Sequence, residues 1–248
     1  MISESYLRQQ QLLHDSPSYG VASLHFAPLV AAVVRAAKPT SLCDYGAGKM
    51  RLLTALQAEG VSVPEYLPYD PAFPEYGEAV PADLVCCIDV LEHVEPGYLG
   101  ALLKHLASLT KRLAFITVHT APAVKHLPDG RNAHLIIEPI EWWKVVLCQY
   151  FEVAVCERDE NPNSYYLIAT IRSDASQMIG SKKPDTQGFE FARPFTQSVP
   201  RIPEELGYRE IGKYASHYNP TSDDQSSLSH HQSNRASECS DAARGLDR

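Results

Sequence analysis

Two glycines after the first short strand candidate form the first feature with chemical potential. Residues 41–45 read as a strand that runs into a turn built on Gly46 and Gly48. Such a turn lets the backbone approach a ligand where a Cβ would clash, and open α/β sheets bind ligands at the carboxyl ends of their strands. Asp44 is placed to fix this turn or to meet an amino group of a ligand. The alternative is an ordinary connection between a strand and a helix.

A second carboxylate, Asp70, ends the next strand candidate, residues 65–69. A carboxylate at this position can accept hydrogen bonds from both hydroxyls of a ribose. Asp70 therefore predicts a nucleoside-containing ligand, although a turn residue before Pro71 would have the same type.

The third feature is a strongly apolar strand candidate, residues 83–88, followed directly by Asp-Val-Leu-Glu-His-Val at residues 89–94. Together with the glycine turn and the acid at position 70, in this order, the segment resembles class I S-adenosylmethionine (SAM)-dependent methyltransferases. The resemblance covers roughly residues 19–172. It implies a sheet that ends in an antiparallel hairpin, SAM lying across the carboxyl ends of the strands, and methyl transfer by in-line displacement.

The resemblance also assigns cofactor-binding positions. The methionine end of SAM is assigned to Asp44, Gly46 and Gly48, and its ribose to Asp70. The wall of the site is assigned to Asp89, Val90 and Leu91, and the covering N-terminal segment to Tyr19 and Gly20.

The chain departs from the family pattern at two places. Met50 stands where the usual motif has its third glycine. Only residues 71–82 separate the second strand candidate from the third, which is too short for a helix and an edge strand. We therefore expect the edge strand after the second strand to be missing, and the adenine contacts are left unassigned.

Acids and histidines form a possible divalent-metal site from Asp89, Glu92, His93 and His134. Oxygen and imidazole ligands suit Mg²⁺ or Mn²⁺, and a metal could lower the pKa of an acceptor hydroxyl. The arrangement is similar to that of metal-using O-methyltransferases of small-RNA 3′ ends and of ubiquinone biosynthesis. The alternative is a scaffold role, in which the acid and histidine of the segment 89–94 cap a helix or fix a loop.

Candidates for catalysis and for acceptor binding lie near the same edge. His119 and His93 are the candidate general bases, since a histidine titrates close to neutral pH; a hydrogen-bonded loop residue is the alternative for His119. The candidates for binding the acceptor are Lys125, Arg131, His134 and Trp142.

The remaining pattern predicts an α/β fold with a mostly parallel sheet and helices on both faces. Strands are expected at 41–45, 65–69, 83–88, 113–118, 151–156 and 165–171, the last two as a hairpin. Helices are expected at 24–37, 51–59, 91–109 with an interruption at Pro96, and 139–149.

Composition divides the chain of 248 residues into three parts. Residues 1–172 form the expected methyltransferase domain, residues 173–214 a partly docked extension, and residues 215–248 a polar tail too poor in apolar residues to fold. The six cysteines lack a C-x-x-C pair, and no apolar stretch is long enough to span a bilayer. We expect a cytoplasmic protein that does not bind membranes.

The net charge of −8 argues against a nucleic-acid surface without excluding a local one. We expect transfer of a methyl group to a small-molecule acceptor, with oxygen as the target atom. Two alternatives stay open: a metal-dependent methyltransferase of an RNA or nucleotide ribose, and a catalytically silent SAM-fold scaffold. The glycine turn and Asp70 count against the last of these.

Overall fold

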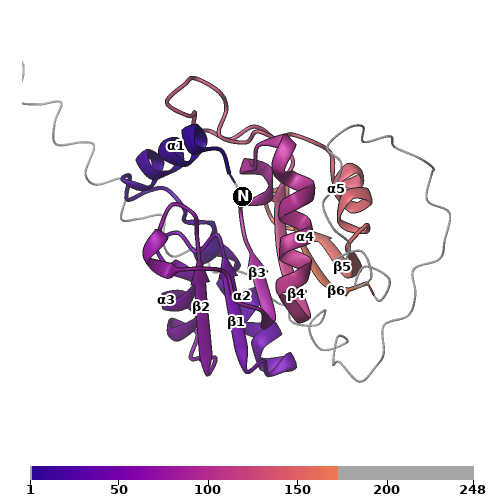
Figure 1. The fold of residues 1–248 in the computed structure, drawn as a ribbon. Coiled ribbons are helices and arrows are strands. Elements are labelled where there is room, and N and C mark those ends of the chain that lie inside the picture. The colour runs from indigo at the N-terminus through magenta and orange to yellow at the C-terminus, as the bar shows by residue number, and fades with distance from the viewer. Residues whose placement is uncertain (1, 173–248) are drawn as a thin grey trace, which may run out of the picture.

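The structure is a computed structural model that describes residues 2–172, so the predictions for residues 173–248 lie outside the described residues. A central sheet of six strands runs through the molecule with helices packed around it (Figure 1). The strands, in the order of the sheet, are β2 (Glu65–Tyr69), β1 (Ser41–Tyr45), β3 (Ala82–Cys87), β4 (Thr110–His119), β6 (Ser164–Ile171) and β5 (Phe151–Arg158). The helices are α1 (Glu4–His14), α2 (Ala22–Ala37), α3 (Arg51–Ala58), α4 (Leu99–Leu109) and α5 (Ile140–Leu147).

The pairing of the strands confirms the predicted mixed sheet. β2, β1, β3 and β4 are parallel to one another, whereas β6 runs antiparallel to both β4 and β5. The predicted loss of an edge strand is also confirmed, because β2 is itself the edge of the sheet. The connection from β2 to β3 contains only a short 3₁₀ turn, Pro74–Tyr76.

Each face of the sheet has its own apolar core, because side chains alternate between faces along a strand. Cys43, Val85 and Ile116 pack with α4 and α5 on one face. Leu84 and Phe115 pack with α2 and α3 on the other. Helices therefore cover both faces, as predicted, and the carboxyl ends of the parallel strands are left for a site.

The segment after β3 differs from the predicted helix over residues 91–109. It forms two 3₁₀ turns, Leu91–His93 and Pro96–Tyr98, and only then the α-helix α4. Pro96 has no N–H to continue an α-helix and disfavours helical geometry at the residue before it. Glu92 and His93 thus lie in a tight turn, separated from the long helix.

Helix α1 is an element that the sequence patterns did not predict. Ser3 caps its first turn by accepting a hydrogen bond from the backbone N–H of Tyr6. Only Tyr6 and Gln10 of this helix are buried, so it has no apolar stripe of the usual kind. As Figure 1 shows, α1 lies over the open end of the sheet.

Among the helices of the described residues, none combines the length and hydropathy that crossing a bilayer requires. The predicted cytoplasmic location stays a prediction.

Candidate functional site

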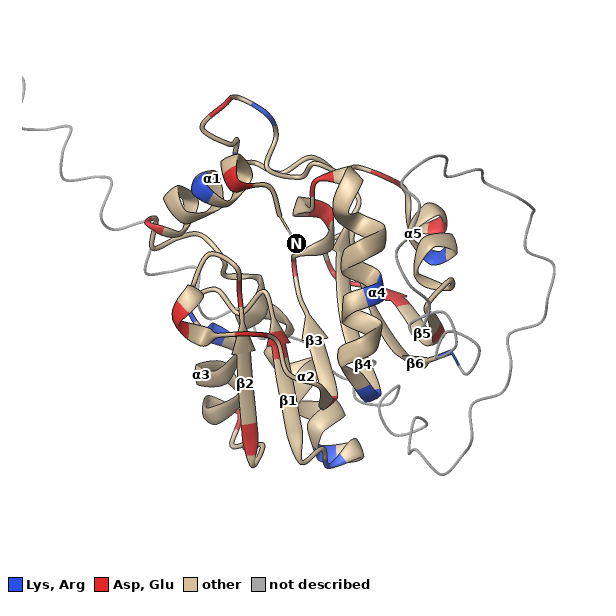
Figure 2. Ribbon diagram, viewed as in Figure 1, with Lys and Arg blue, Asp and Glu red and all other residues tan. Residues whose placement is uncertain are grey.

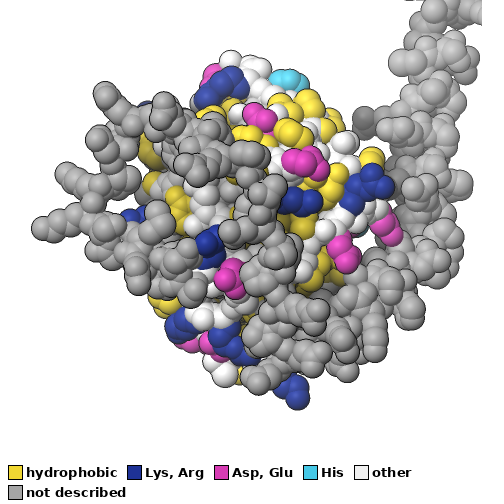
Figure 3. Space-filling view, turned by 90° about the vertical axis from the view of Figure 1, so that its right-hand side faces the viewer, with side chains coloured by type: hydrophobic (Ala, Val, Ile, Leu, Met, Phe, Trp, Pro, Cys, Tyr) yellow, Lys and Arg dark blue, Asp and Glu magenta, His cyan; other side chains and the backbone are white. Residues whose placement is uncertain are grey.

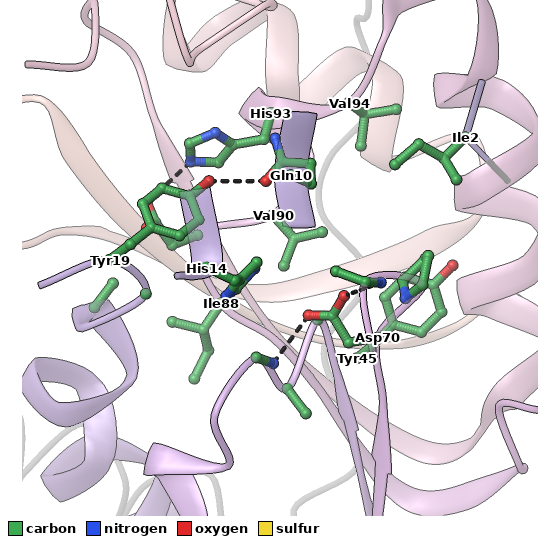
Figure 4. Close-up of a pocket in the computed structure, with 18 of the residues that line it drawn as sticks. Ile2, Gln10, His14, Tyr19, Tyr45, Asp70, Ile88, Val90, His93 and Val94 are labelled. Carbon is green, nitrogen blue, oxygen red and sulfur yellow. Dashed lines mark hydrogen bonds and ion pairs between the residues drawn. The ribbon is translucent and has the colours of Figure 1, made fainter. Parts of the chain in front are cut away.

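The glycine turn after β1 is held in place by the end of β2. The backbone N–H groups of Gly46 and Ala47 both donate to the carbonyl oxygen of Tyr69, at 2.7 and 3.0 Å. The N–H of Gly48 donates to Oδ2 of Asp70 at 2.9 Å, a contact drawn in Figure 4. The shape of the turn is therefore set by backbone groups and one carboxylate of the neighbouring strand.

Gly46 cannot be replaced without displacing its surroundings. Its φ angle is +85°, and an added Cβ would lie 2.3 Å from Cγ2 of Val90. The turn thus contacts the segment 89–94 directly at Val90. Met50, which replaces the third glycine, keeps a left-handed φ of +53°, a conformation that costs a non-glycine residue roughly 1 kcal/mol.

Asp44 lies beneath the turn and is 3% exposed. Its Oδ2 accepts a hydrogen bond from the hydroxyl of Tyr66 on β2. Burial raises the pKa of Asp44 to about 7, although the bond from Tyr66 acts to lower it. A carboxyl in this state would gain from a cationic group in the pocket, because a positive charge favours its ionised form.

Asp70 stands at the carboxyl end of β2, as predicted, and is almost fully buried. Oδ2 accepts from Gly48, and Oδ1 accepts from the backbone N–H of Ala72 at 2.8 Å. Each carboxylate oxygen has two lone pairs, so both oxygens keep a lone pair for a ligand.

A pocket opens above the turn, and eight of the nine predicted cofactor-binding residues line it; the exception is Leu91, which is fully buried. One side of the pocket comes from residues that the sequence analysis missed. Ile2 and three residues of α1, Tyr6, Gln10 and His14, follow one another at a spacing of four (Figure 4). This spacing places side chains on one face of a helix; that polar, aromatic stripe was the signal available in the sequence.

Asp89, His93 and His134 form a group at the edge of this pocket. One ligand atom from each, a carboxylate oxygen or an imidazole nitrogen, lies within 4.8 Å of the others. Asp89 adopts a left-handed φ of +59°, and its N–H donates to Oγ1 of Thr117 at 2.9 Å. Strained non-glycine conformations of this kind concentrate at functional sites.

Both histidines of the group have the same arrangement of hydrogen bonds. Nδ1 of His93 lies 2.8 Å from the carbonyl oxygen of Ala133, and Nδ1 of His134 lies 2.6 Å from that of Ala121. Because a carbonyl only accepts, each Nδ1 carries a proton, and Nε2 is left as a ligand atom in the neutral form of each ring. Metal-binding histidines are held in this way by their surroundings.

The charges in the group are strongly coupled. Burial acts to lower the pKa of His93, yet the hydrogen bond and charge of Asp89 raise it overall. Burial, together with the nearby His93, lowers the pKa of His134 to about 4. His134 is therefore neutral at pH 7, the form in which an imidazole binds metals.

Glu92, the fourth predicted metal ligand, lies outside the group of three. It is 1% exposed, and its Oε1 accepts from the backbone N–H of His119 at 2.8 Å. Its carbonyl oxygen accepts from the N–H groups of Leu135 and Ile136. Oε2 is buried and has no hydrogen-bond partner among the described residues. Glu92 thus ties the end of β4 to the loop that carries His134.

The other candidates lie outside the lining of the pocket, within the part of the chain that the structure describes. His119 has its Nδ1 3.0 Å from the carbonyl oxygen of Ala121 and its ring 5.0 Å from that of His134. Trp142 packs against the core beside the fully buried Trp143. Figure 3 shows the face that carries α5, on which hydrophobic side chains mix with charged ones.

Lys125 and Arg131 do not form a common basic surface. Nζ of Lys125 lies 5.2 Å from the ring centre of Tyr19, and Arg131 pairs with Asp129 at 2.7 Å. Figure 2 likewise shows basic and acidic positions next to each other in the loop between β4 and α5.

A comparison with protein families identifies the family of this chain. A family model described as a methyltransferase domain matches residues 22–153, more than half of the chain. The chain belongs to this methyltransferase family. The predicted resemblance to class I SAM-dependent methyltransferases is thereby confirmed. Helix α1 precedes the matched region of this methyltransferase. A comparison with curated proteins gives no match.

A comparison with solved structures finds similarity to other methyltransferases. One is a 1,6-didemethyltoxoflavin-N1-methyltransferase of Burkholderia thailandensis, with 15% identity, a TM-score of 0.49, and coverage of 67% of this chain and 88% of the other. Mitomycin 7-O-methyltransferase has 17% identity and a TM-score of 0.48, and the match covers 66% of this chain and 60% of the other. Magnesium protoporphyrin IX methyltransferase of Synechocystis PCC 6803 has 17% identity and a TM-score of 0.42, and the match covers 68% of this chain and 95% of the other. Likeness at this level does not assign an acceptor to this methyltransferase.

Proposed function

We propose that this methyltransferase binds SAM over the glycine turn and transfers its methyl group to an oxygen of a small acceptor held beside a divalent metal. The observation that carries the proposal is the convergence of Asp89, His93 and His134 next to the turn. Val90 links the two parts, because it follows Asp89 in the chain and contacts Gly46.

The residues around the turn fit SAM. Gly46 and Gly48 line the pocket with backbone atoms alone, which a nucleoside with a charged tail can approach closely, and Asp70 keeps lone pairs for the ribose hydroxyls. Asp44, whose pKa lies near 7, would be ionised by the ammonium group of the methionine end. When bound, SAM supplies a methyl group on a sulfonium that an oxygen nucleophile can take.

The residues of the second group fit a divalent cation. One carboxylate oxygen and one nitrogen from each of two imidazole rings, all within 4.8 Å of one another, match the ligand types of Mn²⁺ and similar ions. Burial and the nearby Asp89 raise the pKa of Glu92, whose Oε2 has no partner in residues 2–172, to about 8; a cation beside the group would favour its ionised form. Such a cation would lower the pKa of an acceptor hydroxyl, while Asp89 and His93 hold it at the edge of the pocket.

A small acceptor is favoured over RNA by the net charge of −8 and by the partners of the two predicted basic residues. RNA binding requires several basic side chains directed at phosphates. Arg131 is paired with Asp129, and Lys125 lies over Tyr19. A terminal ribose of RNA or of a nucleotide stays the second candidate, because its two hydroxyls could bind the same metal. Binding of a short RNA that weakens steeply with salt would support that candidate.

The cofactor part is tested by calorimetry with S-adenosylhomocysteine. Asp70→Ala should weaken binding by roughly 1–3 kcal/mol, the scale of a lost hydrogen bond to a charged group. Glu65→Ala, at the exposed amino end of the same strand, is the matched control and should bind as the wild type does. Equal affinities of the wild type and Asp70→Ala would refute the ribose assignment.

The metal part is tested separately with Mn²⁺, followed by electron paramagnetic resonance. The wild type should bind one Mn²⁺ and release it to EDTA, and methyl transfer to a catechol probe should stop on chelation. Full activity of the chelated protein would refute the proposed metal dependence and would leave the proposed SAM binding unaffected.

A further inference from the structure

His14 of α1 lies inside the pocket with an unused hydrogen-bonding atom. Its Nδ1 is buried and has no hydrogen-bond partner within residues 2–172. Its ring packs edge-on against Tyr19, with ring centres 4.9 Å apart, and against Phe73, at 5.0 Å. A buried polar atom without a partner is unfavourable, so a ligand atom that meets it would gain affinity.

The ring of His14 lies beside the same glycine as the carboxylate assigned to the ribose. A Cβ built on Gly48 would lie 3.2 Å from Cε1 and 3.7 Å from Nδ1 of His14, and the N–H of Gly48 donates to Asp70 at 2.9 Å. Figure 4 shows His14 in the pocket between Tyr19 and Asp70. His14 and Asp70 thus approach Gly48 from two elements that are distant in the sequence.

We propose that His14 binds the ribose diol of the cofactor together with Asp70, so that α1 forms part of the cofactor site. This inference rests on the proposed function. A hydroxyl both donates and accepts, so one ribose hydroxyl can bond to the imidazole nitrogen and another to the carboxylate. Burial lowers the pKa of His14, which keeps its ring neutral and leaves one nitrogen able to accept.

Polar contacts keep α1 in the position that this role requires. The hydroxyl of Tyr19 donates to Oε1 of Gln10 at 3.0 Å, and Nε2 of Gln10 donates to the hydroxyl of Tyr6 at 2.6 Å. Tyr6 in turn donates to the carbonyl oxygen of His93. At the start of the helix, Ser3 donates to both carboxylate oxygens of Glu95 at 2.8 Å.

The attachment of α1 distinguishes it from the helices that pack on the sheet. Those helices bury apolar faces, whereas α1 is joined mainly through hydrogen bonds and buries only Tyr6 and Gln10. The position of His14 in the pocket therefore depends on these polar contacts of α1 and not on an apolar face.

The test combines variants of His14 with cofactor analogues that lack one hydroxyl. Binding of S-adenosylhomocysteine and of its 2′-deoxy and 3′-deoxy analogues is measured by calorimetry. His14→Ala should weaken binding of the parent compound about 10-fold, and binding of at least one deoxy analogue by less than about 2-fold. His14→Asn, whose amide can bond to a hydroxyl near the position of Nδ1, should recover most of the affinity.

His25→Ala is the matched control, because His25 is exposed and its Nε2 pairs with Asp159 away from the pocket. It should leave all three affinities unchanged. The same loss for the parent and both deoxy analogues would show that His14 acts only on the structure, and tighter binding in His14→Ala would show that it blocks the site. Either result overturns the proposal. Failure of the wild type to bind S-adenosylhomocysteine would instead refute the proposed function itself.

Discussion

The glycine turn is held by backbone hydrogen bonds from the adjacent strand, whereas the group of Asp89, His93 and His134 is assembled from side chains of two segments far apart in the chain. In the turn, Gly46 and Ala47 share one carbonyl oxygen of β2. In the group, His134 comes from the long loop after β4, and its ring is held by one bond to Ala121. The turn therefore depends on few side chains, and the group depends on several.

This difference indicates a division of roles within the pocket. A site made by backbone groups tolerates changes in most side chains and suits a ligand common to a whole family. A site made by side chains changes with each substitution and suits a ligand that differs between family members. The comparison predicts that substitutions in the two regions affect different ligands.

The largest effect is expected for Gly46→Ala. A Cβ at this position combines a φ of +85° with an approach of 2.3 Å to Val90. We expect a loss of about 3 kcal/mol in the free energy of unfolding and a loss of S-adenosylhomocysteine binding. Urea unfolding and calorimetry measure both.

The control for this variant is Gly60→Ala. Gly60 also has a positive φ, of +68°, but an added Cβ would meet nothing within 4 Å. This control should lose about 1 kcal/mol and bind as the wild type does. Similar losses in both variants would show that contact with Val90 is unimportant.

His134→Ala tests whether the two regions are independent. It should weaken Mn²⁺ binding at least about 100-fold, because loss of a direct ligand exceeds the loss of an outer hydrogen bond. S-adenosylhomocysteine binding without metal should stay unchanged, since the turn has no contact with this side chain. An unchanged Mn²⁺ affinity would show that His134 is not a metal ligand. A loss of S-adenosylhomocysteine binding would show that the two regions are not independent.

Asp44→Asn tests the charge beneath the turn. The pKa of Asp44 is about 7 in the folded protein and about 3.8 when unfolded. The folded state therefore binds more protons between these values, and its stability falls as the pH rises through 7. The unfolding free energy of the wild type, relative to Asp44→Asn, should fall by about 2 kcal/mol from pH 5 to pH 7. A difference that does not change with pH would contradict the buried, protonated state.

The smallest effect is expected for Arg131→Ala. The pair of Arg131 with Asp129 is exposed, with side chains 48% and 38% accessible, and exposed ion pairs contribute little to stability. Thermal unfolding and S-adenosylhomocysteine binding should match the wild type. A large loss of acceptor binding in this variant would restore Arg131 as part of the acceptor site and favour an anionic acceptor.

Most of the elements and most of the pocket lining beside the glycine turn could be predicted from local patterns. Gly46 and Gly48 follow a strand directly, and the short segment before β3 leaves no room for a further strand. The partners that hold these residues could not be predicted. Tyr66 and Tyr69 lie on β2, and their contacts with Asp44 and the turn depend on the register between two strands.

The candidate metal group shows more clearly that spacing in the sequence does not predict the directions of side chains. Glu92 and His93 are adjacent in the chain, yet only His93 points toward Asp89, because a 3₁₀ turn replaces the expected first turn of a helix. Glu92 instead bonds to the backbone of His119. Spacing in the sequence could nominate both residues but could not separate their directions.

The sequence by itself determined the order of the strands and helices that follow α1, the glycine turn and the loss of the edge strand, because each follows from the conformational preferences and apolar periodicity of neighbouring residues. Only the tertiary structure decided which side chains meet. Contacts between distant segments fix the left-handed conformation of Asp89 and the path of the loop that carries His134. They also fix the position of α1 over the pocket. Such contacts are fixed by packing on the completed sheet, and no local pattern encodes them.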